Sequence, residues 1–533
     1  MTGKLFYGDN LEILRDSIAD ESVDLVYLDP PFNSNASYNV LFKAPDGHES
    51  HAQMEAFDDT WHWTDSAERA FDEVIHSGNT NAAEMLRAMR SFLQENDMMA
   101  YLAMMAVRLI ELNRVLKKTG SLYLHCDPTA SHYLKILCDA IFGPKFFVNE
   151  IIWKRYGAHN DVGQGSKHFG RVHDTILFYS RSAERSWTQL FAPLDPEYIE
   201  KTYTHVEEKT GRRFMTTPLT GPGGAEKGNP VYEWNGHTRA WRYNIEKMRD
   251  LDKRGRLYYS KTGYARQKFY LEDSKGVPVQ SIWTDIPSLS GAHAERLGYP
   301  TQKPLTLLER IINASSNEGD VVLDPFCGCG TTVHAAQKLN REWIGIDVTH
   351  LAISLIQKRL RDAFGPIPIE VLGVPKDIGG AQELAKALPH QFQYWAVSLV
   401  DAVPYRGGKK GADGGVDGYI YFKPDGKVTE KAVVSVKGGK NVGVTMIREL
   451  IATVAKENAK IGVFITLAPP TGPMIKEAAS AGFYKTEYGS YPKIQILTIE
   501  QLFEGHKPDM PWIDPTVFKK AKKEDTGKQH KLL

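Results

Sequence analysis

The segment Asp29-Pro30-Pro31-Phe32 follows an apolar run and carries residue types suited to chemistry on an amino group. Each proline fixes φ and lacks a backbone N–H, so the segment presents acceptors, namely the Asp29 carboxylate and the Pro30 carbonyl. Accepting both hydrogens of an exocyclic amine would draw the nitrogen lone pair out of conjugation with an aromatic base, on which Phe32 could stack. The segment therefore indicates methylation of an adenine or cytosine amine. A strand that simply ends in a proline turn is the alternative.

A second stretch, residues 319–332, joins an apolar strand to a glycine-rich turn. We expect a helix over residues 333–339 and another strand over residues 343–346, which together make a β-α-β unit. Gly328 and Gly330 would let a ligand approach the backbone at the point where a helix N-terminus points. The stretch therefore predicts a ligand-binding loop.

The absence of two known motifs from this loop limits the classes of ligand that it could bind. It has no Lys-Ser/Thr ending of the kind that binds nucleoside triphosphates, and no third glycine at the dinucleotide-binding spacing. Asp347 ends the second strand, where an acid can bind two ribose hydroxyls, or it could be an ordinary helix N-cap. A nucleoside without a polyphosphate fits best, and S-adenosylmethionine is such a molecule.

In this order the two motifs resemble those of the permuted amino-group DNA methyltransferases, whose catalytic D-P-P-F/Y segment precedes the S-adenosylmethionine loop. The resemblance covers roughly residues 1–180 and 285–362. It implies an α/β, Rossmann-like fold with a seven-stranded, mostly parallel sheet, methyl transfer from S-adenosylmethionine, and a base flipped out of double-stranded DNA. Other matching segments are Gly8-Asp9-Asn10, Arg114-Val115-Leu116, residues 120–125, His173-Asp174, residues 176–179 and Thr301-Gln302-Lys303-Pro304.

The resemblance also implies roles for individual residues. Asp9 could be a turn residue and Lys303 an exposed lysine, but family position places both at the cofactor, with Lys303 near its methionine moiety. His125 and Cys126 end an apolar strand and are expected in the core or at a loop edge. The expected catalytic residues are Asp29, Pro30, Pro31 and Phe32. The expected cofactor-binding residues are Asp9, Lys303, Asp324, Phe326, Gly328, Gly330, Thr331 and Asp347.

The sequence of the catalytic segment favours one base over the other. Asp-Pro-Pro-Phe resembles the adenine-directed signature, whereas cytosine-N4 members more often begin this segment with serine. We therefore expect a DNA adenine-N6 methyltransferase, with cytosine N4 as the alternative. A DNA-binding or assembly component with an inactive methylase fold is a third hypothesis, and the intact Asp29 and glycine loop argue against it.

Composition narrows the class of protein further. The 533 residues suffice for about three domains, and 65 lysines and arginines equal 65 acids, which argues against a protein that coats DNA by charge alone. The four cysteines, Cys126, Cys138, Cys327 and Cys329, are too few and too badly spaced for a disulfide framework or a zinc site. No long apolar segment is evident, so we expect a cytoplasmic protein without a membrane segment.

The middle of the chain, residues 181–287, is rich in aromatic and basic residues and is where permuted methyltransferases place their target-recognition domain. Residues 151–280 hold 22 lysines and arginines against 15 acids, which suits contact with phosphates, while aromatics could stack on bases. Alternatively, Trp234, Trp241 and Tyr258 form this region's own core. The inserted residues 46–81 could shape the site entrance or form a packed loop.

From residue 363 a new unit begins, for which we expect a helix over 391–403, strands over 416–422 and 432–436, a helix over 444–459 and a strand over 461–467. This unit resembles the Mrr-like branch of the PD-(D/E)xK nucleases. Asp417 and Lys437 occupy the places of residues that hold a divalent metal such as Mg²⁺. Ser435 stands where that family has Glu or Gln. Glu449 could replace the missing acid or lie on the surface, and Asp413 could be a loop residue.

These observations leave open whether the chain also cuts DNA, as a bifunctional restriction-modification enzyme would, and whether it forms a homodimer or joins a restriction system as a subunit. A lysine-rich tail should add salt-sensitive affinity for phosphate. The expected domains are residues 1–180 (catalytic part), 181–287 (target recognition), 288–362 (cofactor part), 363–515 (restriction-endonuclease-like) and 516–533 (basic tail).

Overall fold

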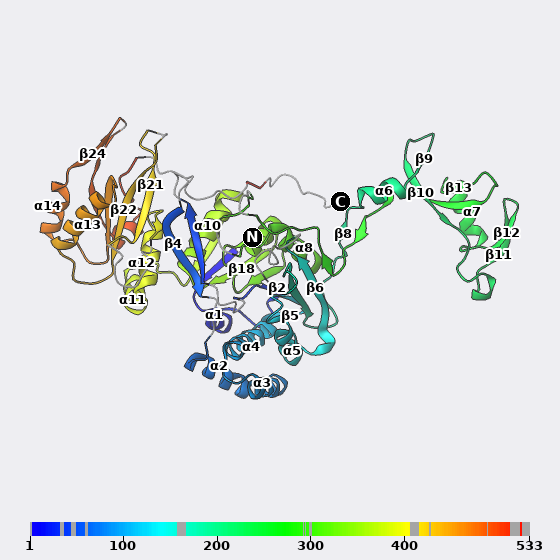
Figure 1. Cartoon of the computed structure of the whole chain (residues 1–533), viewed down its shortest axis with the longest axis horizontal. Coiled ribbons are helices and arrows are strands. Elements are labelled where there is room, and N and C mark those ends of the chain that lie inside the picture. Colours follow the sequence, from blue (N-terminus) through cyan, green and yellow to red (C-terminus); the bar gives the residue numbers. More distant parts are fainter. Residues whose placement is uncertain are drawn as a thin grey trace. The chain divides into compact units, whose positions relative to one another are not determined.

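The computed structural model describes residues 3–31, 62–156, 167–290, 293, 295–297, 301–405, 415–425, 428–487, 489–511 and 523–524, and the backbone of 37–43 and 49–58. The chain divides into two compact units. One comprises Met1–Thr188 and Ser281–Lys528, and the other is built on Gln189–Gln280. Figure 1 labels their elements.

The methyltransferase-like part is built on a nine-stranded sheet in which only β7 runs antiparallel to its neighbours. The resemblance to the DNA methyltransferases implied seven strands. The two additional strands, of two and four residues, lie at the edges. In spatial order the strands are β16 (Ile282–Trp283), β6 (Phe147–Lys154), β7 (His173–Ser180), β5 (Leu116–Cys126), β2 (Val23–Leu28), β17 (Val321–Asp324), β18 (Glu342–Asp347), β1 (Gly3–Tyr7) and β19 (Ile369–Leu372).

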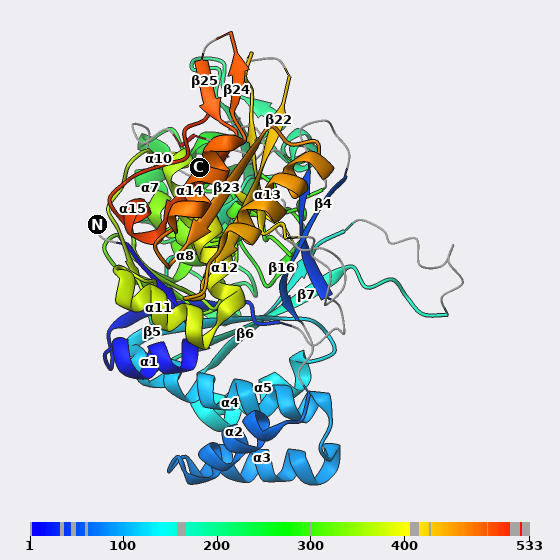
Figure 2. The same cartoon turned by 90° about the vertical axis from the view of Figure 1, so that its left-hand side faces the viewer.

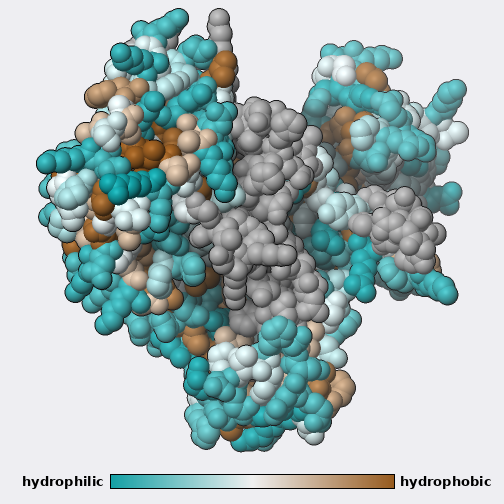
Figure 3. All heavy atoms as spheres, turned by 60° about the vertical axis from the view of Figure 1, so that its left-hand side comes forward, coloured by the Kyte–Doolittle hydropathy of each residue, from teal (hydrophilic) through white to brown (hydrophobic). Residues whose placement is uncertain are grey.

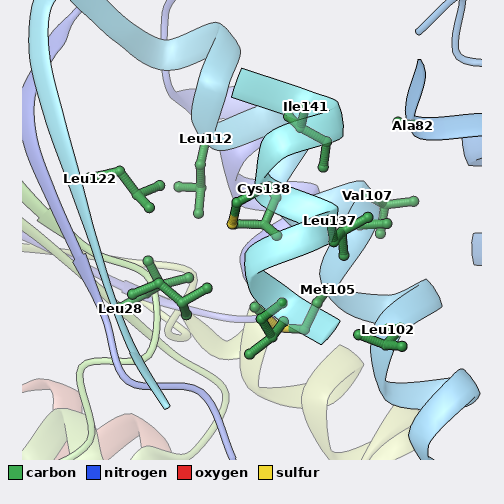
Figure 4. Close-up of a cluster of buried hydrophobic side chains, with 14 of the residues drawn as sticks. Leu28, Ala82, Leu102, Met105, Val107, Leu112, Leu122, Leu137, Cys138 and Ile141 are labelled. Carbon is green, nitrogen blue, oxygen red and sulfur yellow. The ribbon is translucent and has the colours of Figure 1, made fainter. Parts of the chain in front are cut away.

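Side chains alternate between the two faces along each strand, so the buried strands give both faces of this sheet an apolar surface. Helices cover both faces. Leu28 and Leu122 face the helices on one side, where Figure 4 draws them toward Leu112 and Cys138. Tyr123 faces the other side and its hydroxyl lies 2.7 Å from that of Ser315. The first face carries α1 (Asn10–Ser17), α4 (Asp97–Val115) and α5 (Ser131–Phe142), and the second α8 (Leu305–Ser315), α9 (Thr331–Lys338) and α10 (His350–Phe364).

The inserted segment is not the packed loop that was one of our two expectations. It contains part of a hairpin, β3 (Ser37–Lys43) with β4 (Glu49–Asp58), and helix α2 (Asp65–His76), which is followed by α3 (Thr80–Leu93). Helix α2 buries Ala67, Ala70, Phe71 and Val74 against α3 and α4. This spacing is the helical period, so the sequence held a signal for the helix.

The unit Gln189–Gln280 lies within the region predicted for target recognition. Trp241 is fully buried in its core, as the alternative for this aromatic proposed, and Trp234 packs partly buried against the same core. Its elements are β8 (Phe191–Ala192), α6 (Pro196–Thr202), β9 (His205–Val206), β10 (Arg213–Pro218), β11 (Val231–Trp234), β12 (His237–Ala240), α7 (Ile245–Lys253), β13 (Leu257–Tyr259), β14 (Ala265–Tyr270) and β15 (Val277–Pro278).

The C-terminal part has its own five-stranded sheet, in the order β20-β21-β22-β23-β26. The predicted helix over 391–403 ends at Ser398, and a short strand follows; the other elements agree with prediction within a few residues. Figure 2 shows α13 and α14 over one face of this sheet. The elements are α11 (Ile378–Ala387), α12 (Pro389–Ser398), β20 (Val403–Pro404), β21 (Gly418–Phe422), β22 (Glu430–Lys437), α13 (Val444–Lys456), β23 (Ile461–Thr466), α14 (Gly472–Ser480), β24 (Phe483–Thr486), β25 (Gly489–Pro492), β26 (Ile494–Thr498) and α15 (Ile499–Phe503).

The surface drawn in Figure 3 is mainly hydrophilic, with scattered apolar side chains. Large apolar side chains that are more than half exposed include Phe483 and Ile475. Among the described residues, no helix has the length and apolar character that crossing a membrane requires.

Candidate active site

Asp29 directly follows β2, at the edge where the parallel strands β2, β5, β17 and β18 all have their carboxyl ends. In open α/β sheets this edge is where ligands bind. The Asp29 carboxylate accepts a hydrogen bond from the Nζ atom of Lys303. Pro30 is buried and Pro31 partly exposed, whereas Phe32 lies outside the described residues. The structure thus brings together two predicted site residues that lie 274 positions apart.

The turn that carries Lys303 is held by side chains of its own neighbours. Gln302 accepts a hydrogen bond from the Leu297 amide at 2.8 Å and donates one to the Glu295 carbonyl at 2.9 Å. The Glu295 carboxylate accepts the Leu305 amide, at the start of α8, at 2.7 Å. These bonds fix the backbone on both sides of Lys303, which is itself buried.

Asp347 organises the glycine loop. One carboxylate oxygen accepts the Gly328 amide at 2.9 Å, and the other accepts the amide and the hydroxyl of Thr349 at 2.9 and 2.8 Å. The N-cap of α10 is Thr349, so Asp347 is not the N-cap that the alternative proposed. Burial raises the pKa of Asp347 to about 6, against the lowering effect of these hydrogen bonds.

Two other residues of the loop, Gly330 and Thr331, also contribute to the packing of the helices behind it. Gly330 has a φ of +74°, and a Cβ there would lie 2.7 Å from Ile356 of α10. Glycine at this position is therefore required by packing as well as by backbone conformation. The Thr331 hydroxyl accepts a hydrogen bond from buried Arg359 at 3.1 Å, so this side chain also serves the packing of α9 on α10.

Asp324 ends β17 and is buried beneath the loop. One of its oxygens accepts the Phe326 amide at 3.0 Å. Burial raises its pKa to about 7, opposed by a hydrogen bond from Thr332 and reinforced by the charges of Asp29 and Asp347. The charges of Asp29 and Asp347 thus reach Asp324, so three carboxylates lie at this strand edge, with the Lys303 ammonium group beside Asp29.

Asp9 lies near the same sheet edge, two residues after the end of β1. It is the N-cap of α1, accepting the Leu11 amide at 2.8 Å, and it pairs with Arg108 at 3.1 Å. Arg108 also donates to Asn10 at 2.6 Å, and Asn10 donates to the Pro325 carbonyl at 2.8 Å. This chain of bonds ties the Gly-Asp-Asn segment to the loop after β17. Sequence reasoning missed Arg108, although an arginine in the apolar segment that forms α4 was a signal.

A buried polar network lies behind Asp29. The two ring nitrogens of His125 lie 2.9 Å from the Tyr27 hydroxyl and 2.9 Å from an Asp174 oxygen. His125 and Cys126 are fully buried, which confirms the expected core location. Burial opposes ionisation of Asp174, but His125, then Lys303 and Arg155, hold its pKa below the ordinary value.

Asp417 and Lys437, the residues predicted for a nuclease-like metal site, lie at the ends of neighbouring strands. Asp417 lies just before β21, and its carboxylate accepts the Val436 amide at 2.6 Å, next to Lys437 at the end of β22. Ser435 is buried, and Glu449 is exposed on α13, in agreement with a surface role. Over the described residues, no group of three or more His, Cys, Asp or Glu side chains could hold a metal. Asp413 lies outside them.

Comparison with known families identifies both parts of the chain. Residues 23–358 match the model of the N6/N4 class described as DNA methylase. The chain belongs to this DNA methylase family. Residues 384–504 match the model described as restriction endonuclease. The prediction of an α/β DNA methyltransferase with a C-terminal restriction-endonuclease-like domain is thereby confirmed.

Individual methyltransferases are similar over most of the chain. The type II methyltransferase M.EcaI of Enterobacter cloacae is 30% identical over 69% of this chain and 71% of its own length. The StyLTI Mod subunit, a type III restriction-modification protein of Salmonella typhimurium, is 29% identical over 63% of this chain and 50% of its own length. The DNA adenine methyltransferase YhdJ of Escherichia coli is 25% identical over 67% of this chain and 82% of its own.

Proposed function

We propose that this DNA methyltransferase transfers a methyl group from S-adenosylmethionine to adenine N6 in double-stranded DNA. The observation that carries the proposal is the position of Asp29 beside Asp324 and the glycine loop, at one sheet edge. The Asp-Pro-Pro-Phe sequence and the likeness to a protein named as an adenine methyltransferase favour adenine over cytosine N4.

The residues at this edge fit the proposed cofactor. S-adenosylmethionine carries a positively charged sulfonium, and Asp324 and Asp347 place two carboxylates at the glycine loop. Asp347 would bind the ribose with the lone pairs that Gly328 and Thr349 leave, while the exposed half of Asp9 faces solvent for a further contact. When bound, the cofactor supplies an electrophilic methyl carbon whose bond to sulfur breaks as the bond to N6 forms.

The protein's own contribution is to activate and orient the amine. Asp29 and the Pro30 carbonyl would accept the two N6 hydrogens, which raises the electron density on nitrogen, while Phe32 would stack on the flipped base. The proton that N6 loses after transfer would pass to Asp29 or to water. No step needs a cysteine, in keeping with the burial of Cys126, Cys138, Cys327 and Cys329.

DNA contacts are proposed for the unit Gln189–Gln280. Because Trp241 is used in the core, stacking would fall to partly exposed aromatics such as Tyr259 and Phe269. Exposed basic side chains of this unit could neutralise phosphates. They include Arg239, Arg242, Arg249, Lys253, Arg254 and Lys261.

The test is to incubate the purified chain with plasmid DNA and labelled S-adenosylmethionine and to map the modified bases. We expect N6-methyladenine at one short sequence context. N4-methylcytosine in its place would select the cytosine alternative, and no incorporation of label would contradict the proposal. Similarity to a Mod subunit favours membership of a restriction-modification system in the cytoplasm, and a homodimer is tested by light scattering of the same sample.

For the C-terminal domain we propose DNA binding without intrinsic cleavage. Ser435 cannot supply the negative charge that holds a hard cation firmly, which leaves Asp417 as the one acid at the expected metal-binding positions. Glu449 is exposed on α13, whose buried residues are Ile447, Leu450, Thr453 and Val454, which gives the substitute-acid role no support.

We expect wild type, Asp417→Ala and Lys437→Ala to leave unmethylated plasmid equally intact in the presence of Mg²⁺. The readout is conversion of supercoiled to nicked or linear DNA. Robust cutting by wild type that both substitutions remove would instead establish the bifunctional restriction-modification enzyme. Cutting that survives both would show that the nuclease site lies elsewhere.

A further inference from the structure

We propose that Lys303 is a positioning residue for methyl transfer, whose ammonium group binds Oδ2 of Asp29 and thereby orients the carboxylate so that Oδ1 accepts a hydrogen of the amine. The inference rests on the role proposed for Asp29 above. It differs from the expectation that Lys303 is chiefly a cofactor ligand, since its Nζ atom contacts the side chain that would bind the amine.

Hydrogen bonds of neighbouring residues fix the position of Lys303. Its backbone is fixed on one side by Gln302 and on the other by the bond between Glu295 and the first amide of α8. The side chain is 9% exposed and that of Asp29 18%, so the pair is shielded from most of the solvent. A shielded ion pair is screened far less than a surface pair. The contact can therefore hold the Asp29 carboxylate in one orientation.

Lys303 lies among several acids. Asp324, on β17, is a second carboxylate whose own pKa is raised by burial and, more weakly, by the charges of Asp29 and Asp347. Asp174, on β7, is a further acid whose pKa the charge of Lys303 helps to lower. Of these acids, Asp29 is the one whose carboxylate accepts a hydrogen bond from the Lys303 ammonium group.

The contact with Lys303 occupies one oxygen of Asp29 and leaves the other for the amine, which has only hydrogens to give at that position. Since Lys303 contacts Oδ2, the N6 hydrogen is assigned to Oδ1. Lys303 thus acts through Asp29 and does not itself touch the reacting atoms.

The decisive variants are Lys303→Met, which removes the charge, and Lys303→Arg, which retains it. For Lys303→Met we expect the single-turnover methylation rate at neutral pH to fall about tenfold or more. Calorimetric affinity for S-adenosylmethionine should stay within about threefold of wild type. Lys303→Arg keeps a cation that can bind Oδ2 of Asp29 and should restore most of the wild-type rate.

Lys117 offers a matched control. Its Nζ atom lies 2.7 Å from an oxygen of Asp24. Asp24 is on β2, the strand that Asp29 follows, but at the amino end of that strand. Lys117→Met should leave the rate unchanged. An unchanged rate in Lys303→Met would overturn the proposal, as would loss of cofactor affinity as the only effect, which would make Lys303 a cofactor ligand.

A second measurement is independent of methylation. In thermal unfolding, Asp29→Asn and Lys303→Met combined should lower Tm by less than the sum of the single effects, because either change breaks the same pair. Additive losses would overturn the proposal. If wild type fails to methylate, the proposed function fails, but this coupling between Asp29 and Lys303 can still be read.

Discussion

Asp29→Ala is expected to lower the single-turnover rate of DNA methylation by about three orders of magnitude, the upper range for removing one polar group aimed at a reacting centre. The substitution removes the carboxylate that would accept an N6 hydrogen, while the glycine loop and Asp347 are left intact. Affinity for S-adenosylmethionine, measured by calorimetry, should therefore remain close to that of wild type.

The control for Asp29→Ala separates chemistry from folding. Removing Asp29 also removes the carboxylate that accepts a hydrogen bond from Lys303, and loss of this ion pair should lower the stability of the folded protein. Asp29→Asn keeps the shape of the side chain and should show the same loss of rate with a smaller loss of Tm. Asp16→Ala changes an exposed acid on α1 and should change neither. Methylation at the wild-type rate by Asp29→Ala would exclude this residue as the acceptor.

The parts of the fold that sequence reasoning predicted are those with local signals. The strand, glycine turn, helix and strand around Gly328 lie within thirty residues of one another, and hydrophobic period and glycine placement are enough to define them. The same holds for β21, β22, α13 and β23. The edge strands β16 and β19 were missed because two- and four-residue strands carry no detectable alternation.

The contacts that the sequence could not predict join residues far apart. Nothing local connects Lys303 with Asp29, or Arg108 with Asp9, because each pair forms only when separate strands and helices meet. Gly330 illustrates a different limit. A glycine beside a ligand loop suggests close approach of the ligand, yet its Cβ position faces Ile356, a side chain whose location depends on how α10 packs.

The two carboxylates at the ends of β17 and β18 give the site a built-in dependence on pH. Burial raises the pKa of Asp324 to about 7 and that of Asp347 to about 6. As pH falls through these values both groups take up protons, and the negative charge that would attract a sulfonium declines. Affinity for S-adenosylmethionine should accordingly be highest at mildly alkaline pH and should weaken as the pH is lowered.

Asp347→Ala is expected to weaken binding of S-adenosylmethionine by about tenfold or more at a pH where the wild-type carboxylate is ionised, since about 1.4 kcal/mol corresponds to a factor of ten. The substitution removes the proposed ribose ligand and also the acceptor that holds the Gly328 amide. A hydrogen bond to a charged group contributes about 1.5–3 kcal/mol, so the loss of even one accounts for this change in affinity.

Calorimetry on wild type and Asp347→Ala across the acidic range gives a second, independent check of the same residue. Wild type should lose affinity in two overlapping steps, and the variant should keep only the step due to Asp324. Glu342→Ala, an exposed acid at the opposite end of β18, should follow wild type throughout. Unchanged affinity in Asp347→Ala at mildly alkaline pH would mean that the cofactor's ribose lies elsewhere, because the variant would then lack a charged acceptor without consequence for binding.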